Sequence, residues 1–176
     1  AVAEVLFGDY NPAGKLPVTF YRNVSQLPDF EDYNMTGRTY RYMQDVPLFP
    51  FGYGLSYTTF GYGKTVLDKN ELTAGQSLKL TVPVTNTGKC NGEEVVQVYL
   101  RKQGDAEGPI KTLRAFKRVS IPAGKTVNVE FDLKDKELEW WDDQSNTVRV
   151  CPGNYDIMVG GSSKEEDLQR TTIAIK

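Results

Sequence analysis

Two pairs of adjacent acidic residues are the first groups in this sequence that could do chemistry, Glu93-Glu94 and Asp142-Asp143. Glycoside hydrolysis needs two carboxyl groups on opposite sides of a sugar bond. Neighbouring residues of an extended strand point to opposite faces, so neither pair converges if its backbone is extended. Glu93-Glu94 stands at the start of an expected strand, where charge is easily solvated, and Asp142-Asp143 in a hydrophilic turn. We interpret both pairs as structural, so the sequence names no catalytic residue.

Two tryptophans, Trp140 and Trp141, precede the second acidic pair. Their flat rings could form a platform on which a sugar ring stacks. In a strand, however, one of two neighbouring side chains faces the core and the other faces out. We therefore expect one core anchor and one rim contact, with the carbohydrate platform as the alternative. Substrate-binding residues stay unknown at this point.

Cationic and aromatic side chains alternate around Thr39 as a short strand would arrange them, at Arg38, Tyr40, Arg41 and Tyr42. Such a cluster could hydrogen-bond an anionic or hydroxyl-rich partner. More often, a run of this kind pairs with nearby acids. The acids available for pairing are Glu31, Asp32 and Asp45.

The composition excludes several classes of site. Histidine is absent, which removes Ser-His-Asp triads, His-based acid–base catalysis and His metal sites. A net charge of −2 without a basic patch argues against a nucleic-acid partner, and no apolar run is long enough to span a membrane. No phosphate-binding glycine loop, EF-hand or zinc spacing occurs, so we expect no metal site and no cofactor.

The two cysteines, Cys90 and Cys151, both fall at the edges of expected strands. A disulfide between them would close a long loop and could add about 4 kcal/mol of stability. Two unpaired, partly buried thiols are the other interpretation, and the sequence favours it.

From Tyr57 onward, apolar and polar residues alternate with period two, which indicates strands with one buried face. The clearest examples are 78–84, 96–100, 127–133 and 155–159. Turn residues recur every 8–12 positions, and helical periodicity is nearly absent; the acidic run 164–167 reads as a solvated loop. Seven or eight antiparallel strands in about 115 residues predict an all-β fold, an immunoglobulin-like or fibronectin type III-like sandwich of two sheets.

The first 56 residues show no such period. Residues 1–8 read as the end of a helix closed by glycine, with no initiator Met and no leader sequence, which suggests a fragment of a longer protein. Leu16–Tyr21 is expected to be extended and, because it contains a proline, to lie at an edge. The aromatic stretch 48–60, with Gly52 and Gly54 between its rings, is expected to link this arm to the sandwich. Such an arm cannot build a core of its own.

Several strings of the sequence resemble the C-terminal end of glycoside hydrolase family 3 enzymes. The most specific are Asn-Pro-Ala-Gly-Lys-Leu-Pro at 11–17 and Phe-Gly-Tyr-Gly-Leu-Ser-Tyr-Thr at 51–58. Further matches in family order are 6–8, 18–20, 37–42, 84–88, 92–99 and 153–163.

The resemblance implies a parent enzyme, meaning the full-length protein to which this chain would belong, that removes sugars from β-linked glycosides with retention, as an exo-acting β-xylosidase or β-glucosidase. Residues 1–56 would be the tail of its α/β sandwich domain plus the linker, and residues 57–176 its fibronectin type III-like domain. The family's aspartate nucleophile and acid/base glutamate lie in domains without a counterpart here, so this fragment is expected to be inactive. The Gly-Arg-Thr-Tyr-Arg form at 37–41 is similar to that of β-xylosidase-like members.

The resemblance also implies partners and a compartment. We expect the sandwich to buttress the catalytic domains of the same parent chain, with β-linked oligosaccharide reaching it only through that parent. A homodimer through the exposed linker surface is a further option. The alternative is a carbohydrate-binding or protein-interaction module, and a periplasmic or secreted location is expected from the family.

Overall fold

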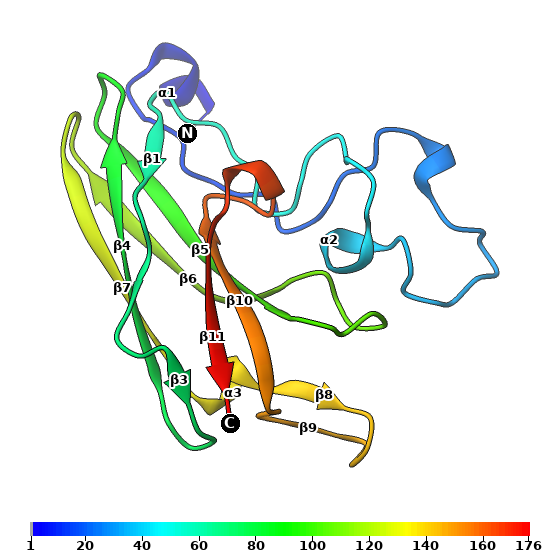
Figure 1. Ribbon diagram of the computed structural model, residues 1–176. Coiled ribbons are helices and arrows are strands. Elements are labelled where there is room, and N and C mark those ends of the chain that lie inside the picture. Colours follow the sequence, from blue (N-terminus) through cyan, green and yellow to red (C-terminus); the bar gives the residue numbers. More distant parts are fainter. Residues whose placement is uncertain (1) are drawn as a thin grey trace.

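The computed structural model describes residues 2–176; Ala1, the first residue of the expected N-terminal helix, lies outside the described residues. The molecule has two parts (Figure 1). Residues 57–176 form a compact body of strands, and residues 2–56 form an arm that runs along one side of this body and loops away from it. We use the names arm and body for these two ranges.

The body contains two main sheets. The first has β4 (Leu78–Asn86) at its centre and antiparallel neighbours β1 (Phe60–Tyr62), β2 (Val66–Leu67) and β7 (Thr126–Leu133). The second has the order β3 (Glu71–Leu72), β11 (Gln169–Ile175), β10 (Gly153–Gly160), β5 (Gly92–Lys102) and β6 (Thr112–Ile121). A separate hairpin joins β8 (Trp140–Asp142) to β9 (Thr147–Arg149) at the end of the body far from α1 (Figure 1).

One hydrophobic core fills the space between the two sheets. Every second residue of β4 is fully buried, and these side chains share a single cluster with those of β5, β10 and β11. Burying each of these aliphatic side chains contributes about 2 kcal/mol of transfer free energy. The predicted alternation of the body is therefore confirmed, and the fold is mostly β.

The described residues contain three short helices. α1 (Val2–Phe7) ends just before Gly8, as expected for residues 1–8, whereas the sequence pattern did not indicate α2 (Thr39–Tyr42) or α3 (Asp135–Leu138). The strands are not all antiparallel, because β3 pairs in parallel with β11. The acidic run 164–167 is exposed, as expected, but it is not a plain loop: Glu165–Asp167 form a 3-10 helix, η2, and the Glu165 carboxylate binds Lys111 and Arg170. A second 3-10 helix, η1 (Val24–Gln26), lies in the arm.

The expected short strand at residues 37–42 is wrong. The four residues Thr39–Tyr42 form the helix α2, and Thr39 adopts a φ of 56°. The Tyr40 ring explains why: it stacks on Phe51 at 4.3 Å between ring centroids and meets Tyr99 of β5 edge to face at 5.9 Å. These tertiary contacts outweigh the local preference for an extended backbone.

The arm is held together by its two extended segments. Leu16 donates a backbone hydrogen bond to Tyr53 and accepts one from Gly52, both of 2.8 Å. The predicted extended stretch Leu16–Tyr21 forms only a single strand-like bridge, between Phe20 and Phe49. The arm then joins the body through Ser163, whose amide donates to the Phe51 carbonyl at 2.8 Å.

Candidate functional site

An open cleft of about 470 Å³ lies where the arm meets the body. Residues from the arm, from β1 and the start of β5, and from the β10–β11 connection line it. It brings together four carboxylates, those of Glu93, Glu94, Glu166 and Asp167. A concave site with several acids is the natural place to look for glycosidase chemistry.

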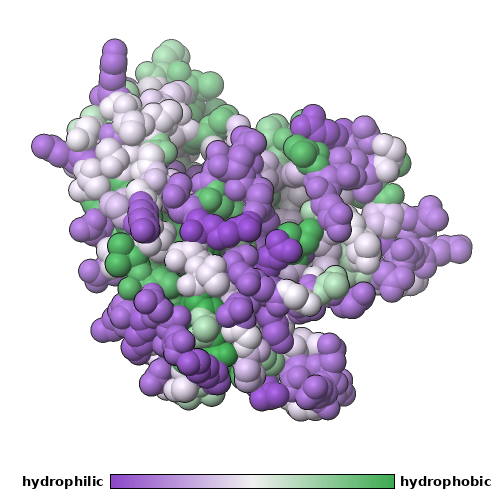
Figure 2. Space-filling model, viewed as in Figure 1, coloured by the Kyte–Doolittle hydropathy of each residue, from purple (hydrophilic) through white to green (hydrophobic). Residues whose placement is uncertain are grey.

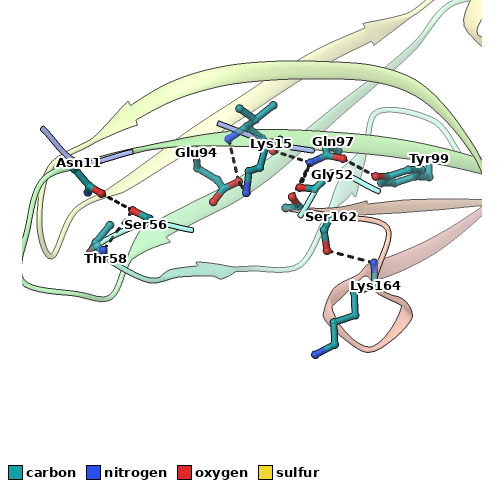
Figure 3. Close-up of polar contacts among 12 residues, drawn as sticks. Asn11, Lys15, Gly52, Ser56, Thr58, Glu94, Gln97, Tyr99, Ser162 and Lys164 are labelled. Atoms are coloured by element: carbon teal, nitrogen blue, oxygen red, sulfur yellow. Dashed lines mark hydrogen bonds and ion pairs between the residues drawn. The ribbon is translucent and has the colours of Figure 1, made fainter. Parts of the chain in front are cut away.

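Each of these carboxylates already has a cation. Lys15 of the arm binds Glu94 at 2.8 Å (Figure 3), and Arg118 binds Glu93. The Lys164 ammonium binds Glu166 and lies 3.8 Å from Asp167. The acids of this cleft therefore bind cations of the chain itself, and the pair between Lys15 and Glu94 joins the arm to the body.

The pair Glu93-Glu94 does split across the strand, as the sequence predicted. Glu93 lies on the outside with Arg118, whereas Glu94 turns inward and its residue is only 6% exposed. The expectation that both charges are solvated is therefore wrong for Glu94. The Glu94 carboxylate is held by Lys15 and by the Val95 amide, at 2.9 Å. Burial, and next the charge of Glu94, raise the pKa of Tyr62 well above its ordinary value, so its hydroxyl stays protonated.

A buried polar network beside this ion pair fixes the arm on the body (Figure 3). The Gln97 side chain donates to the carbonyls of Gly161, at 2.6 Å, and Gly52, at 3.3 Å. Its own carbonyl accepts from the Tyr99 hydroxyl at 2.5 Å. Gly52 has a φ of 79°, and a Cβ there would lie 2.2 Å from Gln97 Oε1. Only glycine therefore fits at this crossing.

Asn11 makes a second connection between arm and body. Its Oδ1 accepts from the Ser56 hydroxyl at 2.9 Å (Figure 3). The same oxygen accepts from the Tyr57 amide at 2.8 Å, and the Nδ2 of Asn11 donates to the Asn91 carbonyl at 2.9 Å. The sequence did not single out Lys15, Asn11 or Gln97 as interacting residues. The sequence feature that could have indicated Asn11 and Lys15 is the family-like string at 11–17, which contains both residues.

The second acidic pair is also structural. Asp142, at the end of β8, accepts from Ser145 at 2.6 Å and Arg149 at 2.7 Å. Asp143 accepts from the indole N–H of Trp141 at 2.8 Å. The two acids thus serve separate partners in the β8–β9 hairpin.

The two tryptophans lie on opposite faces, which confirms the prediction. Trp140 is 3% exposed, meets Tyr155 edge to face at 6.0 Å and donates from its indole N–H to Asp105 at 2.6 Å. Trp141 is 49% exposed and lies opposite Val148 of β9. Only Trp141 is therefore accessible to a ligand.

The arginines beside α2 do not pair with the nearby acids, contrary to expectation. Arg38 donates to the backbone carbonyls of Asp32 and Asn34 instead. Among residues 2–176, no ion pair involves Glu31, Asp32 or Asp45. The Asp32 carboxylate accepts instead from the backbone amide and the side-chain amide of Asn34, at 2.9 and 2.8 Å.

The two cysteines are unpaired, so the disulfide alternative is wrong. Cys90 is exposed rather than partly buried, and Cys151 is buried with its thiol directed at the Arg149 carbonyl, 3.5 Å away. No cluster of three or more acidic or cysteine side chains that could hold a metal occurs in the part of the chain that the structure describes. Within residues 2–176, no helix has the length and apolarity needed to cross a bilayer.

Family models match two parts of the chain. Residues 1–57 match the model of the glycosyl hydrolase family 3 C-terminal domain, and residues 94–163 match that of a fibronectin type III-like domain. The two matches fall on the arm and on the centre of the body.

Similar proteins include several curated glycosidases. The chain is 54% identical to a xylan 1,4-β-xylosidase of Xylanibacter ruminicola, over 99% of this chain and 20% of that protein. It is 43% identical to a β-xylosidase of Formosa agariphila, over 100% and 25%, and 37% identical to a periplasmic β-glucosidase of Salmonella typhimurium, over 93% and 23%. The chain thus spans about a fifth to a quarter of the length of these relatives.

Solved structures give the same result. A β-glucosidase of Erythrobacter marinus matches with a TM-score of 0.83 and 40% identity, over 99% of this chain and 23% of that one. A β-glucosidase of Listeria innocua in complex with glucose matches with a TM-score of 0.80 and 30% identity, over 99% and 26%.

Proposed function

Because the chain belongs to glycoside hydrolase family 3, as the C-terminal region of one of its enzymes, we propose that it is a non-catalytic part of a retaining, exo-acting β-glycosidase. In this proposal the body buttresses the catalytic domains of the same parent chain. β-Xylosides are the preferred substrate class of the parent over β-glucosides. The two β-xylosidase relatives with 54% and 43% identity support this order.

The observation that carries the proposal is the exposed apolar surface of the arm. Phe30 is 95% exposed, Tyr33 is 90% exposed and Phe7 is 85% exposed. The surface over α1 is visible as a green patch at the top of Figure 2. Within α1, the exposed residues Val2, Leu6 and Phe7 are neighbours on one short helix, and an exposed apolar patch of this kind marks a contact site, so a covering partner is expected. The relatives' own length, of which this chain spans a fifth to a quarter, supplies that partner.

The division of the chain follows the same reasoning. We assign residues 1–56 to the tail of an α/β sandwich domain plus linker, and residues 57–176 to an immunoglobulin-type sandwich of the fibronectin type III-like class. The family match at 1–57 supports the first range, and the single core between two sheets supports the second.

Matched substitutions in the isolated chain and in the parent enzyme test the buttress. Val24→Ser and Phe30→Ser change exposed arm residues, and Val66→Ser, on β2, is the control. We expect the arm variants to lower the melting temperature of the parent and not that of the isolated chain, because only the parent covers the arm. The control should shift both proteins equally, and equal shifts for the arm variants would contradict the proposal.

An activity assay tests the lack of catalysis. The isolated chain should release no aryl product from aryl β-xylosides or aryl β-glucosides, because its carboxylates are paired at the cleft. Turnover that follows this polypeptide through successive purification steps would refute that part of the proposal.

A carbohydrate-binding module is the second candidate function, and the half-exposed Trp141 favours it. Its ring is oriented by the hydrogen bond to Asp143, and a sugar could stack on its free face. Affinity electrophoresis in gels with xylan or β-glucan distinguishes this candidate. Retardation that Trp141→Ala removes would support it, and unchanged mobility of the unsubstituted chain excludes it.

A homodimer through the exposed arm is the remaining candidate. Sedimentation of the isolated chain and of the parent separates it from the buttress. Association of the isolated chain alone indicates that two arms cover each other only when the catalytic domains are missing. Self-association of the isolated chain and also of the parent would support a homodimer interface on the arm.

A further inference from the structure

Two arginines from different parts of the chain meet where α2 lies on the body. Arg41 belongs to α2 of the arm and Arg114 to β6 of the body. The place is fixed by backbone contacts: the Ile110 amide donates to the Arg41 carbonyl at 2.6 Å, and the Leu113 amide donates to the Tyr40 hydroxyl at 3.1 Å. These contacts place α2 beside the start of β6, and the charge of Arg41 acts on Arg114.

Both guanidinium groups have buried donors without an acceptor. The Nε atoms of Arg41 and Arg114 are buried and form no hydrogen bond, and the same holds for the Thr112 hydroxyl. Arg114 donates from Nη2 to the Glu139 carbonyl at 2.6 Å, and its Cζ lies 5.4 Å from the centre of the Trp140 ring. Arg41 has only a ring neighbour, with its Cζ 5.6 Å from the centre of the Tyr42 ring.

Neither arginine has a carboxylate within ion-pair distance in residues 2–176. Three arginines of the body do, since Arg118 binds Glu93, Arg149 binds Asp142 and Arg170 binds Glu165. Among residues 2–176, Arg41 and Arg114 are the arginines whose Nε atom is buried without an acceptor.

The two positive charges also act on each other. Burial lowers the pKa of Arg114, and the neighbouring Arg41 lowers it further; Tyr40, Glu139 and Tyr155 offset this in part. Partly buried like charges with unmatched donors cost free energy unless an anion joins them. A carboxylate or another oxyanion is the ligand that planar guanidinium groups fit best.

We propose that Arg41 and Arg114 form an oxyanion site whose ligand is a carboxylate side chain from the catalytic part of the parent enzyme. The proposal rests on the proposed function, because it takes the covered arm as given. The parent is the expected source of the carboxylate for two reasons. α2 follows directly on the exposed residues of the arm, which the proposed function covers with the catalytic domains. This chain also spans only 20–25% of the length of its relatives. The same anion would satisfy charges from the arm and from the body at once, and so lock α2 onto β6.

The test compares Arg41→Gln and Arg114→Gln in the isolated chain and in the parent enzyme. In the isolated chain, Arg41→Gln removes one of two repelling charges, so the melting temperature should stay unchanged or rise by up to about 3 °C. Arg114→Gln also loses the hydrogen bond to the Glu139 carbonyl, so its effect is read from the difference between the isolated chain and the parent. In the parent, the same substitutions leave the carboxylate poorly matched and should lower the melting temperature by about 2 °C or more. Arg118→Gln, which breaks an exposed pair, is the control and should act alike in both proteins.

Two further measurements identify the source of the anion. Arg41→Lys keeps the charge but loses the planar fork, so it should restore part of the stability of the parent. Sodium glucuronate and sodium phosphate are added to the isolated chain against sodium chloride of equal ionic strength. The added anion should raise the melting temperature of the Arg118→Gln variant and not that of the Arg41→Gln variant if it binds at this site. Such a result would support the oxyanion site but would mean that its ligand is a dissolved anion and not a side chain of the parent.

The outcomes separate this inference from the proposed function. The inference is overturned if the Arg41 and Arg114 substitutions act alike in the isolated chain and the parent, and no anion raises the melting temperature of the isolated chain. If Phe30→Ser still lowers the melting temperature of the parent alone, the buttress stands and only the anion site falls. If Phe30→Ser has no such effect, the proposed function falls as well.

Discussion

The arm and the body use apolar side chains in opposite ways. Among the described residues of the arm, Ala13 is the sole hydrophobic residue in the buried class, whereas most large aliphatic side chains of β4, β5 and β10 are fully buried. The body therefore obtains its stability from its own core. The arm is ordered instead by hydrogen bonds, ring stacking and one ion pair to the body.

This difference shows that the arm depends for its order on contacts with other parts of the protein, whereas the body does not. A core of two facing sheets is self-sufficient, because each strand buries one side against the other sheet. The arm leaves Phe7, Phe30 and Tyr33 largely in water, and its attachment relies on ring stacking at Tyr40 and on polar contacts with small net free energies. Substitutions should therefore divide by region.

The largest effect is expected from a core truncation. Leu80→Ala in β4 removes a side chain that is 1% exposed and leaves a cavity, which should cost about 2–5 kcal/mol of unfolding free energy. The matched change Leu6→Ala in the arm, at 75% exposure, should cost less than about 0.5 kcal/mol. Urea denaturation of the isolated chain measures both. Similar costs for the two leucines would erase the distinction between the regions.

A smaller effect is expected at the crossing between arm and body. Gly52→Ala places a Cβ against the Gln97 amide, whereas Gly8→Ala, at a similar positive φ of 83°, meets open space. Both variants bear backbone strain of about 1 kcal/mol, and the clash should add about 1–2 kcal/mol for Gly52 alone. Hydrogen exchange of the Ser163 amide, which donates to Phe51, reports detachment of the arm. Equal protection in both variants would show that the network around Gln97 does not hold the arm.

The next largest effect is expected from loss of Lys15, the cation that pairs with Glu94 where the arm meets the body. Lys15→Met leaves Glu94 without its cation, with only 8% of its side chain exposed, and should cost about 1–2 kcal/mol. Lys164→Met removes a lysine from exposed acids and should stay within about 0.5 kcal/mol. Chemical denaturation of both variants at neutral pH gives the comparison. A Lys15 variant as stable as the Lys164 variant would mean that the ion pair between arm and body does not stabilise the fold.

The smallest effect concerns the β8–β9 hairpin, which lies outside the main core. Hydrogen bonds from Ser145 and Arg149 lower the pKa of Asp142 from 3.8 to about 2. Because the folded pKa is depressed, the carboxylate stabilises the hairpin fully above pH 3.8, and the contribution is lost as the pH falls through about 2. An NMR titration of the Asp142 carboxyl carbon should show this midpoint, and Arg149→Gln should move it upward. A midpoint near 3.8 in the unsubstituted chain would contradict the pairing.

The sequence predicted those parts of the fold that local pattern determines. The alternation in β4 and β7 identified these strands, because one face of each is buried, and β10 shows the same alternation although both of its faces are covered. The opposite orientations of Trp140 and Trp141 followed from the same period. The two free thiols were the favoured interpretation and are present.

The remaining features depend on contacts between distant residues. The helix α2 forms because Tyr40 stacks on Phe51 and Tyr99, and no local pattern encodes that contact. The ion pair between Lys15 and Glu94 joins the arm to β5, so neither residue alone indicates it. The parallel pairing of β3 with β11 involves only two residues of β3, too few to show a period.

The position of β11 has a consequence for the order in which the body is completed during synthesis. β11 lies between β3 and β10, so residues Glu71 and Leu72 obtain their partners only when Ala174 and Ile175 have left the ribosome. Until then, β10 presents an open edge to other nascent chains. Removal of β11 would therefore leave β10, the middle strand of this sheet, without one neighbour and β3 without its partner.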